Sequence, residues 1–355
     1  LYKNAGRGVA MKLETGKLDS ELLKKIVFGK ITYRSEDVSV RPGIGEDCAV
    51  MDFGDYDCIM STDPISSAVS DIGRLAIHIT CNDIASNGVQ PLGIMLAVML
   101  PEGTTDEDVD HIMGQAAQTA AEVKVEIIGG HTEITPAVKQ PVIVSTAIGK
   151  ALKGVSQSGN DMVPGDFIMM TKAVGLEGSG IIASDYEEQL SSVLSAKELA
   201  RAKSFLELVS VVPEGITAGS IGTHGMHDIT EGGILGAVWE MCQISGRGAQ
   251  VWEHEIPIEP ETVKICDHYE IDPLRLISSG SMVIIVPKEK KEQMEKAMAE
   301  AGVACSVIGR IEEADFGIRL LKNGAPEAGA PDSSEELVEI DPPYMDELYK
   351  VVGKE

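Results

Sequence analysis

The chain has 355 residues, of which 43% are apolar and 24% charged. This length suggests two domains, and the composition is sufficient for a full hydrophobic core. Acidic residues outnumber lysine and arginine by 56 to 30, and the net charge of −26 argues against a protein that binds nucleic acid or anionic membranes. The longest apolar run, residues 92–100, is about half of a bilayer span, and the six cysteines form no C-x-x-C pair. We therefore expect a cytoplasmic protein.

Residues 1–152 carry the pattern of an N-terminal α/β domain. A polar, glycine-rich loop over 41–48 precedes its first predicted strand. The sequence Thr-Thr-Asp-Glu-Asp at 104–108 is typical of a helix start, because it places acids at the positive end of the helix dipole. The predicted elements in chain order are a helix over 19–28, strands over 49–52 and 58–62, a helix over 71–87, a strand over 94–99, a helix from 104, and strands over 125–128 and 142–148.

Residues 153–325 are predicted to form a second α/β domain. Residues 153–166 are rich in Gly, Ser and Asp, which is typical of an interdomain linker. The predicted elements are a strand over 167–172, helices over 179–186 and 196–209, a strand-to-helix turn within 224–243, a strand over 282–286 and a helix over 289–301. Residues 326–355 are rich in acids and follow a Gly-Ala-Pro sequence, which predicts a loosely packed acidic tail.

Four aspartates stand at the predicted ends of strands or helices: Asp47, Asp63, Asp83 and Asp228. A single aspartate in such a place is usually a turn or helix cap. Asp83 differs, because it would share the apolar face of its helix with Ile72, Ala76 and Ile79. A buried carboxylate must be protonated, paired or bound to a metal. A metal site and a buried salt bridge are both open interpretations for this residue.

Several carboxylates that converge on one site suit Mg²⁺, which commonly links protein carboxylates to substrate phosphates. Such a site offers a way to bind ATP without a P-loop, and the sequence contains no G-x-x-x-x-G-K-[ST] motif. His131 follows a predicted strand and is either a polar site residue or an ordinary loop histidine. His224 and His227 precede Asp228, but Gly225 interrupts a helical H-x-x-H pattern, so this segment is interpreted as a strand-to-helix turn.

Five segments follow one another in a recognisable order. They are Gly-Ile-Gly-Glu-Asp-Cys-Ala-Val at 43–50, Ser-Thr-Asp-Pro at 61–64, Asn-Asp-Ile-Ala-Ser-Asn-Gly-Val-Gln-Pro at 82–91, Gly-Gly-His-Thr at 129–132 and Met-His-Asp-Ile-Thr-Glu-Gly-Gly at 226–233. Together they resemble the aminoimidazole ribonucleotide (AIR) synthase superfamily, over residues 15–320. The last segment, with Asp-Pro-Leu at 272–274 and Ser-Gly-Ser-Met-Val at 279–283, resembles the branch of the hydrogenase-maturation factor HypE.

The resemblance implies a two-domain AIR synthase-like fold, with ATP and Mg²⁺ in a cleft and N-terminal sheets that pair across a homodimer. It also implies a reaction in which ATP activates an amide, carboxyl or phosphate oxygen, and a maturation factor as protein partner. Carried over by motif, the metal ligands are Asp47, Asp63, Asp83 and Asp228, and the catalytic residues are Asp228, Glu231 and His131. The implied nucleotide contacts are Lys17, Asp47, Asp63, Asn82, Gly129, Gly130, Thr132 and Gly232.

The chain also departs from the HypE pattern. HypE carries a carbamoyl group on a C-terminal cysteine, whereas the last cysteine here is Cys305. Glu133 stands where HypE has a lysine, and Ser279 where it has a glutamate. These departures predict a HypE-like protein that does not carry out the thiocyanate-forming reaction. Two alternatives stay open, a phosphotransferase like thiamine-monophosphate kinase and a non-catalytic nucleotide-binding scaffold.

Overall fold

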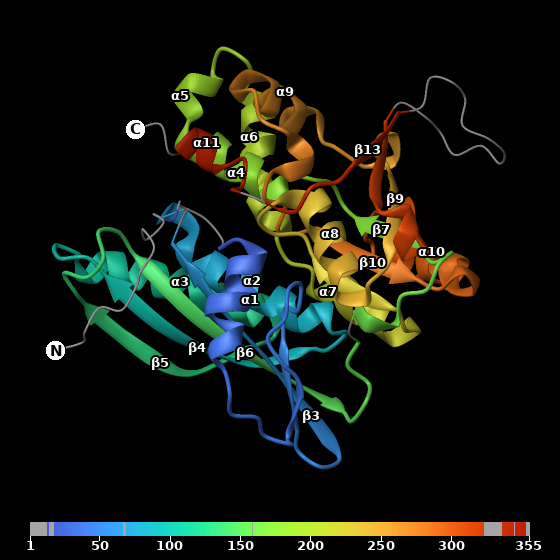
Figure 1. Cartoon of the computed structure of the whole chain (residues 1–355). Coiled ribbons are helices and arrows are strands. Elements are labelled where there is room, and N and C mark those ends of the chain that lie inside the picture. The colour runs from blue at the N-terminus through green and yellow to red at the C-terminus, as the bar shows by residue number, and fades with distance from the viewer. Residues whose placement is uncertain are drawn as a thin grey trace, which may run out of the picture.

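The computed structural model describes residue 13 and residues 18–66, 69–157, 159–322, 336–343 and 345–352. Figure 1 shows two α/β domains, with the N-terminal one drawn in blue to green and the C-terminal one in green to red. The predicted two-domain α/β fold is confirmed. Lys17, an expected phosphate contact, lies outside the described residues. Among the described helices, none is long and apolar enough to span a membrane.

The N-terminal sheet has six strands in the order β1-β2-β3-β6-β4-β5, with β4 and β5 parallel and the other neighbours antiparallel. Helices α2 and α3 cover one face of this sheet (Figure 1). The bounds are α1 (Ser20–Ile26), β1 (Val38–Val40), β2 (Ala49–Asp52), β3 (Tyr56–Ile65), α2 (Ile72–Ser86), β4 (Pro91–Leu100), α3 (Asp106–Val123), β5 (Glu126–Ile134) and β6 (Val142–Leu152).

The sequence explains how these elements pack. In β4 the side chains of Ile94, Leu96, Val98 and Leu100 are buried, as alternation along a strand with one covered face requires. Helix α3 begins with a capping box in which Thr105 and Asp108 bond each other's backbone amides. Helix α2 is buried on almost all sides, because it lies between the first sheet and the C-terminal domain.

The C-terminal sheet has seven strands in the order β13-β12-β9-β11-β7-β10-β8. The sequence predicted β7, β10 and the turn after β8, but not β9, β11, β12 or several helices. The bounds are β7 (Phe167–Thr171), α4 (Leu176–Asp185), α5 (Glu187–Leu190), α6 (Ala196–Ser204), α7 (Val212–Ile221), β8 (Gly225–Asp228), α8 (Gly233–Ser245), β9 (Gly248–Trp252), α9 (Pro260–Tyr269), β10 (Met282–Val286), α10 (Lys291–Glu300), β11 (Cys305–Glu312), β12 (Ile318–Lys322), β13 (Glu336–Glu339) and α11 (Tyr349–Val352).

The two domains meet where α2 packs against α7. Gly215 of α7 lies so close to α2 that an added Cβ would stand 2.3 Å from the carbonyl oxygen of Ala85. The buried Asn82 side chain donates to the carbonyl of Val209 and accepts from the amide of Val211, both at 2.8 Å. A further bond joins the Ser86 hydroxyl to the Asp228 amide, so α2 holds a site residue of the other domain in place.

The prediction of a loosely packed acidic tail is wrong for the part of that segment which the structure describes. Strand β13 joins the second sheet, and Ile340, Leu348 and Val351 are buried. Two of the acids, Asp346 and Glu347, are buried, and hydrogen bonds from backbone amides offset the cost of burying them. The prediction rested on the number of acids and did not weigh the apolar residues that recur among them.

Candidate functional site

A cleft of about 620 Å³ lies between the two domains. Neither lysine nor arginine occurs among the described residues that line it, and its one basic group is a histidine. An acidic cleft of this kind repels a free polyphosphate unless a cation accompanies it. The lining residues are Gly45, Glu46, Asp47, Ser61, Thr62, Asp63, Pro64, Ile65, Ser66, Ile79, Asp83, Glu177, His227, Asp228, Thr230, Glu231, Glu240, Ile277, Ser279 and Tyr349.

The structure brings the four aspartates singled out in the sequence to this one cleft. Asp47 comes from the loop before β2, Asp63 from β3, Asp83 from α2 and Asp228 from the end of β8. Asp83 is 6% exposed and accepts a hydrogen bond from Ser61 Oγ at 2.5 Å. Burial raises the pKa of Asp83 well above its usual value, and the charges of Asp63 and Asp228 raise it further. No described lysine or arginine pairs with Asp83, so the buried salt bridge that the sequence left open is not formed.

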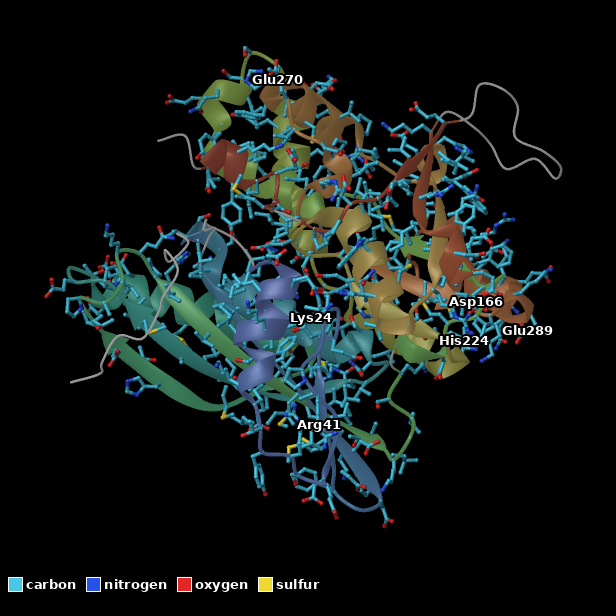
Figure 2. All side chains as sticks on the ribbon, in the orientation of Figure 1. Lys24, Arg41, Asp166, His224, Glu270 and Glu289 are labelled. Carbon is cyan, nitrogen blue, oxygen red and sulfur yellow. The ribbon has the colours of Figure 1, made fainter. Side chains whose placement is uncertain are left out.

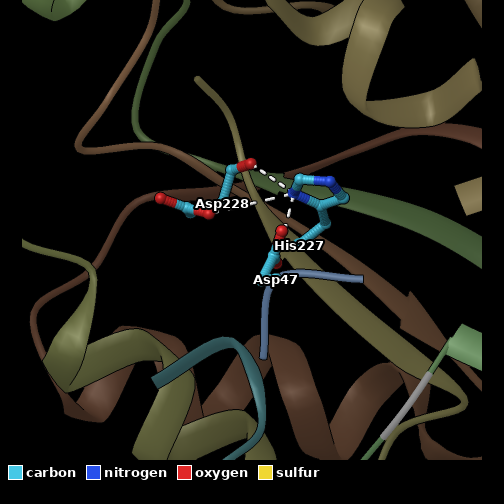
Figure 3. A group of neighbouring side chains, drawn as sticks. All are labelled: Asp47, His227 and Asp228. Carbon is cyan, nitrogen blue, oxygen red and sulfur yellow. Dashed lines mark hydrogen bonds and ion pairs between the residues drawn. The ribbon is translucent and has the colours of Figure 1, made fainter. Parts of the chain in front are cut away.

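His227 supplies a positive charge among these acids. Its Nδ1 lies 2.6 Å from the Asp228 carbonyl oxygen and 3.5 Å from Asp47 Oδ2, and its Nε2 lies 3.3 Å from Glu240 Oε2. Figure 3 marks the contacts of His227 with Asp47 and Asp228 by dashed lines. Burial acts to lower the pKa of His227, but the carboxylates of Asp47, Glu240 and Asp228 outweigh it and raise that pKa to about 10. These carboxylates favour the charged imidazole as long as no cation is bound beside them.

The donor set fits a hard cation. Ligand atoms of Asp47, His227 and Asp228 lie within 4.8 Å of one another, the one such group among the described residues. Two of these three residues offer carboxylate oxygens, which Mg²⁺ prefers. The raised pKa of Asp83 also favours a cation at this place, because a cation bound beside the buried carboxyl offsets the repulsion from the neighbouring carboxylates.

A second group of acids lines the same cleft on the side of the C-terminal domain. Glu177, in the first turn of α4, is buried, and its Oε2 has no hydrogen-bond partner among the described residues. The Tyr349 hydroxyl donates to Glu231 Oε1 at 3.0 Å. The sequence motifs point to Glu231 but not to Glu177 or Tyr349. The available signal for Glu177 was an acid within an apolar, glycine-rich helix. For Tyr349 it was an aromatic residue beside Leu348 and Val351.

Several expected site residues have other surroundings. The Asn82 side chain is buried, does not line the cleft, and bonds Val209 and Val211 at the domain junction. Gly232 also does not line the cleft, and its amide donates a hydrogen bond to Asp346 Oδ2 at 2.8 Å. His224, which the sequence assigns to a strand-to-helix turn, does not line the cleft, and its Nδ1 lies 2.7 Å from Asp166 Oδ2; both residues are labelled in Figure 2.

The residues Gly129, Gly130, His131 and Thr132 do not line the cleft of their own chain. They lie on the exposed edge strand β5, which pairs with β4. His131 is largely exposed, and its Nε2 lies 3.3 Å from Glu133 Oε2. Within one chain, therefore, the structure does not bring these four residues to the aspartates.

Comparison with known proteins decides the family. The family models of AIR synthase related proteins match residues 45–151 with the N-terminal domain and residues 163–320 with the C-terminal domain. The chain belongs to the AIR synthase-related family. A Methanocaldococcus jannaschii protein that carries the name hydrogenase expression/formation protein is 31% identical over 309 residues, which cover 83% of this chain and 88% of that protein. The carbamoyl dehydratase HypE of Rhodobacter capsulatus is 27% identical and covers 70% of this chain and 72% of its own.

Solved structures show the same fold for this AIR synthase-related protein. HypE in a HypE–HypF complex superposes with a TM-score of 0.72 at 23% identity, covering 90% of this chain and 99% of that one. HypE in complex with ATP superposes with a TM-score of 0.66 at 22% identity, covering 92% and 96%. The chain is thus a HypE-like member of the family.

The acids of the cleft predict how the stability of this AIR synthase-related protein depends on pH. Burial raises the pKa of Glu177 from 4.5 to about 7, and the neighbouring carboxylates raise that of His227 from 6.5 to about 10. Both groups bind protons more tightly in the folded state, so their stabilisation is complete below the unfolded pKa and is lost as the pH rises through the folded pKa. We expect the melting temperature of the metal-free protein to fall steadily between about pH 5 and pH 9. Thermal melts in a chelator test this, and a melting temperature that rises over this range contradicts it.

Proposed function

We propose that this chain is an ATP- and Mg²⁺-dependent enzyme that transfers the γ-phosphoryl group to an amide, carboxyl or phosphate oxygen. The observation that carries the proposal is the convergence of Asp47, Asp63, Asp83 and Asp228 in a cleft whose described lining contains neither lysine nor arginine. Carboxylates alone repel a triphosphate, so a nucleotide can enter such a cleft only with a divalent cation between the two.

The four aspartates would hold Mg²⁺. When bound, the ion would offset the charge of the β- and γ-phosphates and align the γ-phosphoryl group. His227 lies between Asp47 and Glu240, where a charged imidazole would hold the Asp47 carboxylate in place. Glu231, at the entrance to α8, faces the cleft and is held by the Tyr349 hydroxyl, in a position to orient an acceptor.

The relatives support this proposal in kind. The R. capsulatus relative is named a carbamoyl dehydratase, and one structure of the same fold holds ATP. No cysteine is among the described residues that line the cleft, and burial raises the pKa of Cys48, which lies beside Asp83, well above its usual value. The acceptor is therefore proposed to be a separate molecule. A maturation factor is proposed as protein partner, by analogy with HypE bound to HypF.

The proposal is tested by ATP turnover. The protein is incubated with Mg-ATP and, separately, with primary amides, carboxylic acids and thiamine monophosphate, while ADP and phosphate are measured. We expect ADP formation that requires both Mg²⁺ and an amide or carboxylic acid acceptor. Formation of thiamine diphosphate would identify a phosphate oxygen as the acceptor, as in a phosphotransferase of the thiamine-monophosphate kinase kind. Tight ATP binding without any turnover would favour the non-catalytic scaffold.

We also propose that the protein is a homodimer built on the N-terminal sheet. Apolar side chains of Leu92, Met95 and Ile128 are about half exposed on the adjacent strands β4 and β5, and β5 is an edge strand. Such an apolar edge is usually covered by another chain. We expect light scattering to give the mass of a dimer, and Ile128→Lys to give a monomer. Val263→Lys, an exposed apolar position on α9, is the control and should stay dimeric.

A further inference from the structure

The acids of the cleft form two groups, and of the second group the proposed function uses only Glu231. The charges that raise the pKa of Asp83 belong to Asp63, Asp228 and Asp47. Those that raise the pKa of Glu177 belong to Asp346 and Glu231. The second group, named here the acceptor-end acids, comprises Glu177 and Glu231 with the hydroxyls of Ser279 and Tyr349, all of which line the cleft.

Glu177 is the residue of this group that most needs a ligand. It is 5% exposed, and although Ser279 lies beside the carboxyl, its Oε2 accepts no well-aligned hydrogen bond from a described residue. A buried carboxyl oxygen without a donor costs free energy that a bound donor would recover. The nearby Ser279 is also buried, and its Oγ forms no well-aligned hydrogen bond with a described residue.

The C-terminal segment builds one wall of this end of the cleft. Asp346 is buried and accepts hydrogen bonds from the amides of Gly232, Leu348 and Ile277 at 2.8, 2.8 and 3.3 Å. This anchor fixes α11 beside α4 (Figure 1) and directs the Tyr349 hydroxyl onto Glu231. These hydrogen bonds hold the wall in place, and the Tyr349 hydroxyl occupies one oxygen of the Glu231 carboxylate, which can accept further bonds.

A metal ion does not fit the acceptor-end acids as well as an organic cation does. Among the described residues, the one set of three acids or histidines close enough to chelate an ion is Asp47, His227 and Asp228, in the other group. Two carboxyls, two hydroxyls and the absence of a lysine or arginine from the described lining favour a larger ligand with several N–H donors and a positive charge.

We propose that the acceptor-end acids bind a cationic nitrogen group, such as an ammonium or guanidinium, of the acceptor substrate. This inference rests on the proposed function, because it names the acceptor side of the same cleft. Glu177 and Glu231 would each accept an N–H donor, and Ser279 and Tyr349 would complete the contacts. The charge of the acceptor-end acids selects a cation over a neutral amide of the same shape.

The test uses methylguanidinium as the probe and methylurea, which has the same shape without the charge, as its control. Dissociation constants are measured by saturation-transfer NMR on the full chain with Mg²⁺ in excess, and Mg-ATP binding is measured on the same samples. We expect methylguanidinium to bind at least about tenfold more tightly than methylurea, the effect of one charge-assisted hydrogen bond. Equal or tighter binding of methylurea, or no saturable binding of methylguanidinium, would overturn the inference.

Variants test whether the probe binds at the acceptor-end acids. Glu177→Gln keeps the shape of the side chain and is expected to weaken methylguanidinium binding about tenfold, and Tyr349→Phe a few-fold. Glu289→Gln, at the far end of the C-terminal domain (Figure 2), is the matched control and should bind as the wild type does. If Glu177→Gln has no effect while Asp63→Asn abolishes binding, the probe occupies the aspartate cluster and the inference fails. Mg-ATP binding, measured on the same samples, tests the proposed function separately.

Discussion

Replacing Asp83 by asparagine is expected to stabilise the metal-free protein and to remove its response to Mg²⁺. The carboxyl is buried among Asp47, Asp63 and Asp228 and has no described lysine or arginine as partner, so its charge opposes folding. Asparagine keeps the shape and the hydrogen bond with Ser61, and the change should add about 1–3 kcal/mol to the free energy of unfolding. The melting temperature without metal should rise by a few degrees.

Magnesium separates this explanation from a general packing effect. In the wild type, Mg²⁺ should raise the melting temperature, because an ion that binds only the folded state stabilises it. In Asp83→Asn that rise should vanish. Asp110→Asn, at an exposed position on α3, should leave both the melting temperature and the response to Mg²⁺ unchanged. A destabilised Asp83→Asn that still responds to Mg²⁺ would show that the carboxylate serves the fold and not a metal.

The second large effect is expected from Gly215→Ala at the domain junction. The new Cβ would stand 2.3 Å from the carbonyl oxygen of Ala85, and backbone atoms cannot yield as a flexible side chain can. Separating α2 from α7 would also strain the Asn82 hydrogen bonds to Val209 and Val211. We expect a loss of about 2–4 kcal/mol in the free energy of unfolding, measured by urea denaturation.

Gly114 provides the matched helical control. It lies on α3, where an added Cβ would meet no atom within 4 Å. Gly114→Ala should therefore stabilise the protein by about 0.5–1 kcal/mol through helix propensity alone. Because α2 carries both Asn82 and Asp83, Gly215→Ala should also weaken Mg-ATP binding, whereas Gly114→Ala should not. If the two alanine variants unfold at the same urea concentration, the close contact at the junction does not stabilise the protein.

Much of the fold could be predicted because its signals are local. The capping sequence at 104–108 and the apolar runs of β4, β7 and β10 predict their elements directly. Helix α7 could not be predicted in this way, because Gly215 and Gly219 lower its helix propensity. The close approach of Gly215 to α2, and of Gly219 to Gly88 just after α2, requires them. Strands β9, β11 and β12 lie in sequences whose apolar and charged residues alternate only briefly, and their pairing is with strands distant in the chain.

The motifs predicted the site correctly for residues that face the cleft. They could not show which neighbouring motif residues face elsewhere. Asp83 and Asn82 are adjacent on α2, about 100° apart around the helix, so one faces the aspartates and the other the C-terminal domain. The order of the motifs does not show that β5 is an edge strand, and so does not place His131. Tyr349 reaches the cleft only because Asp346 anchors the segment before it, a contact between residues far apart in sequence.

The most direct test of the central claim is calorimetric titration of the purified protein with ATP, with and without Mg²⁺. The arrangement of Asp47, Asp63, Asp83 and Asp228 in a cleft without described lysine or arginine predicts micromolar binding that requires Mg²⁺. Asp63→Asn should weaken that binding by about a hundredfold or more while the protein remains folded. Binding of ATP with equal affinity in the presence of a chelator, or unchanged binding in Asp63→Asn, would contradict the account.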